Sequence, residues 1–560
     1  MTFKYLAASK PAQWLAAMLA GYLQACSIAL PWSGQPVWWL QIAALAALVW
    51  LVQRAPSVKN AALCGWLFAT SWLAGSTWWL FISMHTFGGL AAPFAAGAVL
   101  ALGGVLALYY AAACAFYKRF GAVGQYRYAQ AAIIFAAAWL FAELARDTWF
   151  TGFPWGAGGY AHVDGPIAAS ASVWGVYGVG FVASVVAACL ASVHRIRSWW
   201  SAAGLGVFAF VVAAAAVVSK VDANGVWGIF TRSHLLEMPN NVKMPRQEHV
   251  RRTSVTLLQG NIPQGEKFDN SKGIPFALEW YAQQLAASTA TLVIAPETAI
   301  PVLPQQLPNN YWLSLKDRFE KPGKNANQTS QAALIGVPLG SYQDGYTNSV
   351  IGLQPTGLPN ANNVMQPQPY RYDKHHLVPF GEFTPSFFKW FTRMMNIPLG
   401  DFNRGAIGQP DFQFAGQRWA PNICYEDLFG DELAARFRGG SPTVLVNLSN
   451  IGWFGNSIAI DQHLHISRMR AIELGRPMLR ATNTGPTVII DHRGQVTHSL
   501  PRHTLGVLHG AVEGRTGLTP YAWWASRLGH WPLWMLSITI ILIAACAYPV
   551  RSAARKHQKN

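Results

Sequence analysis

Charged residues are scarce in this chain. Only 12% of its 560 residues are Asp, Glu, Lys or Arg, about half the share found in an ordinary soluble protein. Hydrophobic residues reach 52%, and 25 residues are tryptophan, which gathers where membrane helices meet the lipid headgroups. The composition argues against a soluble enzyme and predicts a membrane protein with aromatic anchors.

Acidic residues are fewer than basic ones, 25 against 42, so the net charge is +17. Such an excess can mark a protein that binds nucleic acid. Most Lys and Arg of the short loops, however, lie where a membrane-topology rule places them. We therefore expect membrane lipids, and no nucleic acid, as the partner of this charge.

Cysteine is also rare, with six residues. Five lie inside apolar segments, where a small thiol commonly serves as a packing residue: Cys26, Cys64, Cys114, Cys189 and Cys546. Cys424 stands alone in a long polar region. It has no second cysteine there to pair with, which excludes a disulfide framework.

Long apolar segments are plentiful. They lie near residues 13–32, 37–53, 60–82, 91–117, 130–145, 167–191, 199–219 and 533–549. Each can cross a hydrocarbon core of about 30 Å, some only with the help of flanking aromatic residues. The sequence therefore predicts a polytopic α-helical membrane bundle of about eight helices, with no cleavable signal before it.

The orientation of this bundle follows from Lys and Arg in the short connections. If eight helices alternate, thirteen such residues fall on one side: Lys4, Lys10, Arg54, Lys59, Lys118, Arg119, Arg127, Arg195, Arg197, Arg551, Arg555, Lys556 and Lys559. The opposite short loops carry only Arg146. We expect the basic side, and both termini, to be cytoplasmic.

The region between the last two predicted helices has the pattern of an α/β domain. Short β-rich apolar runs recur at Val255–Leu258, Thr291–Ala295, Ala332–Val337, Thr443–Leu448 and Val488–Ile490. Helical patterns at 276–287 and 461–475 separate some of them, which favours strands covered by helices. We expect a transmembrane region at 1–220, a linker at 221–250, an outward-facing domain at 251–532, and a last helix with a basic tail at 533–560.

Three stretches of this domain carry residues suited to catalysis. Glu297 follows an apolar strand, a frequent position for an active-site carboxylate, although an exposed Glu at a strand end is more common. Lys374 lies in a polar and aromatic cluster and has the donors to stabilise an oxyanion, but it could equally be a surface lysine. Cys424 becomes a nucleophile as its thiolate, although a lone cysteine is more often a buried small residue.

Two adjacent histidines, His375 and His376, raise the question of a metal ion. No third ligand follows at a useful spacing, so we expect neither a metal nor any other cofactor.

Taken together, the three stretches are specific. Pro296-Glu297, then Tyr372-Asp373-Lys374-His375-His376-Leu377-Val378-Pro379-Phe380-Gly381-Glu382, then Cys424-Tyr425-Glu426 occur in the order typical of the nitrilase superfamily. Seven helices before the domain and one after it make the whole chain resemble the apolipoprotein N-acyltransferase family. The stretches Gln259–Gln264, Ser449–Gly455 and Gly475–Gly485 agree with this resemblance.

The resemblance implies an αββα sandwich with a Glu-Lys-Cys triad in the periplasm, on a bacterial inner-membrane protein. Cys424 would be the nucleophile, Glu297 the general base and Lys374 the oxyanion stabiliser. The acyl donor would be a phospholipid, most simply phosphatidylethanolamine. The acceptor would be the N-terminal amino group of a diacylglyceryl-cysteine apolipoprotein, acylated through a ping-pong thioester mechanism in the last step of lipoprotein maturation.

The same resemblance marks supporting positions at Glu382, Tyr425 and Glu426. Phe268 stands where the family often has Trp, and it and Trp453 are expected to contact substrate lipid. The apolar segment 387–395, which contains Trp390, suits an interfacial arm that admits lipid, although a plain core helix has a similar pattern.

Two other functions remain open on the residues alone. A membrane-tethered amidase or nitrilase for a small C–N substrate would use the same triad. A transporter or scaffold would use the outer domain only to bind a ligand, and would favour charges inside the helices. Glu143 is the clearest such charge, with Arg146 as a candidate partner.

Overall fold

The computed structural model describes residues 10–121, 128–192, 252–321, 330–355, 369–384 and 401–557. They divide into two compact units. The helical unit holds the described residues up to Leu80, those from Ala92 to Ser192, and those from His530 onward. The second unit contains the three predicted catalytic residues and is therefore called the catalytic unit below; it holds Phe81–Ala91 and the described residues from Arg252 to Gly529.

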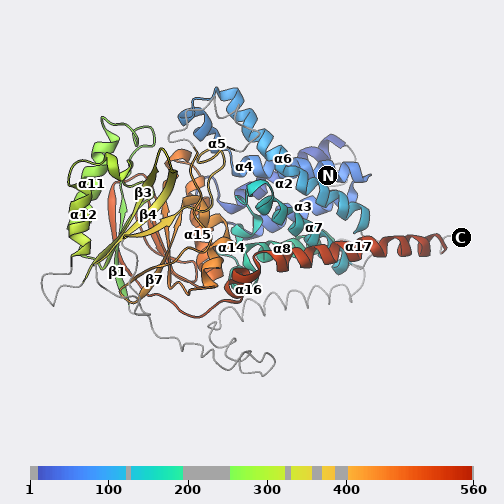
Figure 1. The fold of residues 1–560 in the computed structure, drawn as a ribbon. Helices are drawn as coiled ribbons and strands as arrows, with labels where there is room; N and C mark the ends of the chain where they lie inside the picture. Colours follow the sequence, from blue (N-terminus) through green and yellow to red (C-terminus); the bar gives the residue numbers. More distant parts are fainter. Residues whose placement is uncertain are drawn as a thin grey trace, which may run out of the picture. The chain divides into compact units, whose positions relative to one another are not determined.

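The helical unit consists of long apolar helices (Figure 1). They are α2 (Lys10–Ile28), α3 (Trp38–Arg54), α4 (Val58–Ser76), α6 (Ala92–Phe120), α7 (Tyr128–Thr148), α8 (Ala171–Ser192) and α17 (Trp531–His557). Four described stretches are long and apolar enough to cross a membrane: Ala92–Phe120, Tyr128–Thr151, Ala168–Ser192 and Trp531–Tyr548. The predicted segment at 199–219 lies outside the described residues, and the count of eight stays a prediction.

Small residues let these helices pack closely. A Cβ on Gly65 of α4 would lie 2.7 Å from Cys114 Sγ on α6, so the cysteine fills the space that the glycine leaves. Cys26, Cys64, Cys114 and Cys189 are all buried, as expected of packing residues. The expectation was wrong for Cys546, which is exposed because α17 turns most of its surface away from the other described helices.

The catalytic unit contains two six-stranded sheets (Figure 1). The first has the order β12 (Gly506–Val512), β1 (Thr253–Gln259), β2 (Leu292–Ala295), β3 (Ala332–Ser341), β4 (Gly345–Leu353), β5 (Tyr370–Asp373). The second has the order β11 (Val496–Ser499), β10 (Val488–Ile490), β9 (Met478–Thr482), β8 (Val444–Ser449), β7 (Gln417–Ile423), β6 (Phe412–Phe414). The five β-rich runs of the sequence are all strands.

Alternation along the strands explains why the sheets stack. In β2, Leu292 and Ile294 join the core between the two sheets. Their neighbours Val293 and Ala295 face the opposite way, because successive side chains of a strand point to opposite faces. Both faces of the sheet therefore need an apolar cover.

Helices supply that cover (Figure 1). Helices α11 (Gly273–Ala287) and α12 (Tyr311–Glu320) pack on the outer face of the first sheet. Helices α14 (Gly430–Ala434), α15 (Ala459–Leu474) and α16 (Pro520–Leu528) pack on the outer face of the second. The predicted αββα sandwich is confirmed.

Strand direction decides where the functional loops lie. In the first sheet β1, β2 and β3 are parallel, and two antiparallel pairings return β5 to the same direction. In the second sheet β7, β8 and β9 are parallel. Residues that follow these strands therefore gather at the carboxyl edge of each sheet, where α/β proteins place their sites.

Candidate active site

Each of the three predicted catalytic residues comes directly after a strand. Glu297 follows β2 by two residues, Lys374 is the first residue after β5, and Cys424 is the first after β7. Glu297 and Lys374 make a direct ion pair. Cys424 is close enough for the charges of both to act on its thiol. The structure thus brings together three residues spread over more than a hundred positions of the sequence.

The Glu297 carboxylate is almost fully enclosed, with 7% of the residue exposed. Its Oε1 accepts hydrogen bonds from Asn348 Nδ2 at 2.7 Å and from Lys374 Nζ at 3.3 Å. Its Oε2 accepts from the main-chain N–H of Asn450 at 2.7 Å. Three donors, one from strand β4 and two that follow β5 and β8, hold the carboxylate in one orientation, which a base for a single proton needs.

A second carboxylate lies beside the first. Glu382 Oε1 accepts from Lys374 Nζ at 2.8 Å and from Asn348 Nδ2 at 2.8 Å. Its Oε2 accepts from the main-chain N–H of Val378 at 2.9 Å. Glu382 therefore contacts Lys374 directly, and Asn348 bridges the two carboxylates.

Burial alone would lower the pKa of Lys374, which is 1% exposed. The charges of Glu297, Glu382 and Cys424 outweigh burial and raise that pKa above its ordinary value. Lys374 is therefore a permanent cation at this site, and a fixed positive charge stabilises an oxyanion formed next to it.

Cys424 occupies a sharp turn from strand to helix. Its φ angle is +50°, a left-handed conformation that costs free energy in any residue other than glycine. The 3₁₀ helix η8 (Cys424–Leu428) begins at the cysteine itself. Burial raises the pKa of its thiol to about 12, the Glu297 charge adds to the increase, and Lys374 opposes it. At neutral pH the thiol needs a base to become nucleophilic.

A buried network supports this turn from below. The Cys424 carbonyl accepts from Asn447 Nδ2 and lies 3.2 Å from His463 Nε2. Nδ1 of the same histidine lies 2.8 Å from an Arg480 guanidinium nitrogen. Because arginine only donates, Nδ1 must accept, and the proton sits on Nε2. Asp427 accepts from that Nε2 at 2.8 Å. The Arg480 contact thus fixes the His463 tautomer that can donate to the Cys424 carbonyl.

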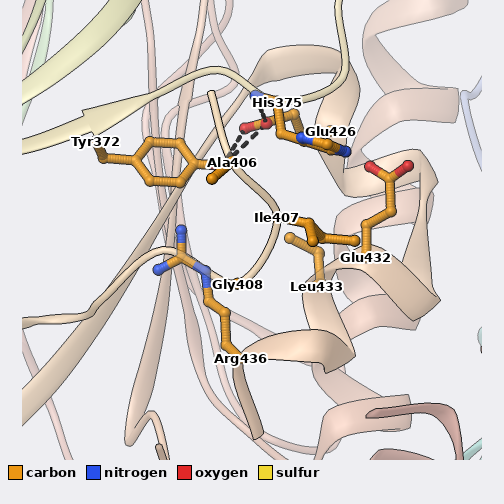
Figure 2. Close-up of a pocket in the computed structure, with 9 residues that line it drawn as sticks. All are labelled: Tyr372, His375, Ala406, Ile407, Gly408, Glu426, Glu432, Leu433 and Arg436. Carbon is orange, nitrogen blue, oxygen red and sulfur yellow. Dashed lines mark hydrogen bonds between the residues drawn. The ribbon is translucent and has the colours of Figure 1, made fainter. Parts of the chain in front are cut away.

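Glu426 ties the lysine loop to the cysteine turn. Its carboxylate accepts from the Tyr372 hydroxyl at 2.8 and 2.9 Å and from the main-chain N–H of His375 at 2.6 Å (Figure 2). It also accepts from the main-chain N–H of Ile423 at 2.6 Å. Beside it, a recess lined partly by Arg436 has about 10 Å³ of free room, about one water molecule. This recess is too small for an acyl chain.

The Tyr425 side chain is buried. Its ring is tilted against the ring of His376 and lies edge-on to the ring of Phe429.

The histidines of the lysine motif have structural partners. His375 Nδ1 lies 2.7 Å from the Gly405 carbonyl, and His376 Nδ1 lies 2.9 Å from Glu432. Within the described ranges, no three His, Cys, Asp or Glu side chains are grouped in a way that could hold a metal ion.

The structure describes two of the three aromatic residues expected to contact lipid. Phe268 and Trp453 are half-buried. The Trp453 ring meets Phe87 edge-on at 5.9 Å, and its carbonyl accepts from the Ser83 hydroxyl at 2.7 Å. Trp390 and the segment 387–395 lie outside the described residues.

Several residues of the site escaped the sequence analysis. Asn348 lies inside β4, far from any motif, and nothing in its neighbourhood signals a role. Asn450 and His463 lie within or near stretches that carried the family resemblance, but a sequence does not show which side chain of a stretch points inward. Lys267, a fully buried lysine, directly precedes Phe268 and could have been found as a charge amid a family-like loop.

Two stacked sheets that bring a Glu, a Lys and a Cys to their strand ends define a carbon–nitrogen hydrolase domain, and the family model of that description matches residues 254–521. The model described as apolipoprotein N-acyltransferase N-terminal domain matches residues 20–189. This chain therefore belongs to the apolipoprotein N-acyltransferase family, and it is an acyltransferase with a membrane-embedded part.

Curated relatives agree over nearly the whole length. The apolipoprotein N-acyltransferase of Verminephrobacter eiseniae is 53% identical over 530 residues, covering 92% of this chain and 92% of that protein. That of Ralstonia nicotianae is 43% identical over 521 residues, covering 92% and 90%. That of Bordetella bronchiseptica is 40% identical over 555 residues, covering 94% and 95%.

Proposed function

We propose that this chain transfers an acyl group from a phospholipid to the N-terminal amino group of a diacylglyceryl-cysteine apolipoprotein, through a thioester on Cys424. The observation that carries the proposal is the convergence of Glu297, Lys374 and Cys424 at one edge of the sandwich, in a chain of this family. A covalent intermediate divides one difficult transfer between two bulky substrates into two easier steps.

In the first step, Glu297 takes the proton of the Cys424 thiol and the sulfur attacks the ester carbonyl carbon of the donor. The oxyanion that forms is stabilised by the Lys374 ammonium, together with the main-chain N–H of Tyr425. The ester C–O bond then breaks. The departing oxygen takes the proton from Glu297, and a lysophospholipid leaves.

In the second step, the amino nitrogen of the acceptor attacks the thioester carbonyl. Glu297 takes one proton from this nitrogen, the C–S bond breaks, and the proton returns to the sulfur of Cys424. The products are the N-acylated lipoprotein and the free thiol. The same base serves both steps because proton removal from each nucleophile occurs at the same place.

The remaining candidates support these steps. Glu382 fixes the Lys374 ammonium through the 2.8 Å contact, and Glu426 holds the loops that carry Lys374 and Cys424 in register. Phe268, Trp453 and Trp390 are proposed to contact the acyl chains of the substrates.

The location of the chain belongs to the same proposal. Apolar helices and the family place it in a membrane. We propose the bacterial inner membrane, with the catalytic unit in the periplasm and both termini in the cytoplasm. Phosphatidylethanolamine is the proposed donor on the basis of the family resemblance, and both lipid substrates would be reached from the outer leaflet.

Intact-mass spectrometry of the purified protein in detergent tests the thioester. After incubation with phosphatidylethanolamine alone, we expect an acyl-sized mass increase that Cys424→Ala lacks and that disappears when a diacylglyceryl-cysteine peptide is added. An amidase for a small C–N substrate would show no such adduct, and neither would a protein that only binds ligand. Normal N-acylation by Cys424→Ala would refute the role of this nucleophile.

A further inference from the structure

Lys267 is a second buried lysine at the same centre. Only 1% of the residue is exposed. Its Nζ donates to the main-chain carbonyl of Glu297 at 3.1 Å. The hydrogen bond attaches the loop after β1 to the turn that carries the proposed base, and it satisfies a carbonyl inside the protein that would otherwise be costly to bury.

The loop that carries Lys267 has little freedom. A Cβ on Gly273, at the start of α11, would lie 1.9 Å from the Glu266 carbonyl oxygen and 3.1 Å from Lys267 Cα. The helix therefore lies directly against the backbone of the loop, at a distance that only glycine allows. Close packing of the loop therefore holds the Lys267 side chain in its buried position.

The same loop also reaches the other end of Glu297. Gln264 Oε1 accepts from Asn450 Nδ2 at 2.9 Å. The main-chain N–H of Asn450 is the donor to Glu297 Oε2. The loop thus acts on the main chain of Glu297 through Lys267 and on its carboxylate through Asn450.

Lys267 also affects the charge balance of the buried site. The carboxylates of Glu297 and Glu382 share one direct cation, Lys374, which leaves one negative charge uncompensated in a buried cluster. Such a charge is expensive away from water. During the proposed reaction it moves from Glu297 to the sulfur and then to the oxyanion, and it never disappears.

The groups around Lys267 determine its ionisation. Burial lowers its pKa to about 8, while the charges of Glu297 and Cys424 oppose the change. On its own loop, Glu266 and Asp269 are exposed to solvent, and Lys374 is bound to the carboxylate of Glu297. Lys267 is therefore charged below about pH 8 and neutral above it.

We propose that Lys267 is a positioning residue that supplies the second positive charge of the acyl-transfer centre and so favours ionisation of the Glu297–Cys424 pair. The inference rests on the proposed roles of those two residues. Without this charge the centre would retain a proton up to a higher pH, because removing a nearby cation raises the pKa of an acid.

Lys267→Gln removes the charge at this position but keeps an N–H donor on a side chain of similar length. Lys272→Gln is the matched control, because Lys272 is an exposed lysine on the same loop. The rate of Cys424 alkylation by iodoacetamide is measured from pH 6.5 to 9.5 on the full-length protein in detergent, by peptide mass spectrometry.

We expect Lys267→Gln to react about tenfold more slowly than the native protein at pH 7, the effect of about one pKa unit. The two rates should converge above about pH 9, where the native lysine has lost its charge. Lys272→Gln should follow the native profile. An unchanged rate for Lys267→Gln at pH 7, or the same loss at every pH, would overturn the proposal.

Lys267→Arg provides a second test, which also serves if the Gln variant fails to fold. Arginine keeps its charge throughout this pH range, so the Arg variant should gain on the native protein above pH 8. A constant ratio between the two would contradict the role of the charge. Absence of an acyl adduct on native Cys424 would instead refute the proposed transfer and leave the alkylation comparison standing.

Discussion

The Glu297 side chain shows how one carboxylate is prepared for its role. Its two oxygens meet an amide, an ammonium and a main-chain N–H. A partner thiol with a pKa of about 12 stays protonated at neutral pH, so catalysis depends on this carboxylate taking the proton rather than on a free thiolate. A variant that lacks this carboxylate should therefore show a different change of rate with pH.

Glu297→Gln removes the proton acceptor, and we expect the thioester adduct on Cys424 to form at least about 100-fold more slowly at pH 7, as for general-base loss elsewhere. The Glu297 charge raises the thiol pKa, so the variant thiol should ionise somewhat more easily. The ionised fraction of a thiol whose pKa lies above this range grows about tenfold per pH unit, so the rate should rise about tenfold per unit from pH 7 to 9. Intact mass against time gives the rate, and full adduct formation at pH 7 would show that another group is the first base.

At the scale of elements, the strained turn at Cys424 is maintained by its neighbours. Arg480 of β9 and His463 of α15 meet Asp427 of η8 in a network in which all three residues are at most 1% exposed. Burial and the Arg480 charge lower the pKa of His463, which keeps it neutral as the tautomer assignment requires. Breaking one member leaves buried donors without an acceptor.

We expect Asp427→Asn to destabilise the catalytic unit by about 3 kcal/mol, the usual loss when one member of a buried ion pair is removed. Asp461→Asn is the control, because Asp461 pairs with Arg502 at a partly exposed site, where such a pair contributes about 1 kcal/mol or less. Thermal unfolding followed by fluorescence compares them. Equal melting temperatures for the two variants would contradict the structural importance of the network.

At the scale of the whole molecule, the position of Arg146 in the helical unit affects the predicted orientation of the chain in the membrane. Arg146 is the one basic residue on the predicted outer side, and it is 1% exposed. Its guanidinium donates to the carbonyls of Phe153 and Trp155 at 2.6 and 2.7 Å and lies 3.5 Å from Glu143. This arginine is held inside the helical unit, so it contributes little to the charge bias that orients the chain.

We therefore expect both termini in the cytoplasm and the catalytic unit in the periplasm. A green fluorescent protein fused after residue 560 should fluoresce, since it folds in the cytoplasm, and alkaline phosphatase fused at the same position should be inactive. An insertion of the phosphatase in the 354–370 region is the matched control and should be active. An active phosphatase at the C-terminus would contradict the eight-helix arrangement.

The sequence by itself determined the two kinds of structure in this chain and the main chemical groups of its site. Low charge and long apolar runs require helices in lipid, because no other regular element satisfies its own backbone there. Apolar β-rich runs predicted the strands, and the motifs around Glu297, Lys374 and Cys424, through the family resemblance that they carry, predicted a shared Glu-Lys-Cys site. These conclusions need only local pattern and short motifs, and the cysteines of the packed helices followed in the same way except at Cys546.

Only the tertiary structure decided how the site is completed. Asn348 comes from the middle of a strand, Asn450 contributes a main-chain N–H, and Lys267 acts from a loop after β1. Their roles depend on which side chains the stacked sheets turn toward one point, and strand pairing between distant segments sets that. Burial also shifts the pKa values of Lys267 and Cys424, because the cost of a charge depends on what surrounds it rather than on its neighbours in sequence.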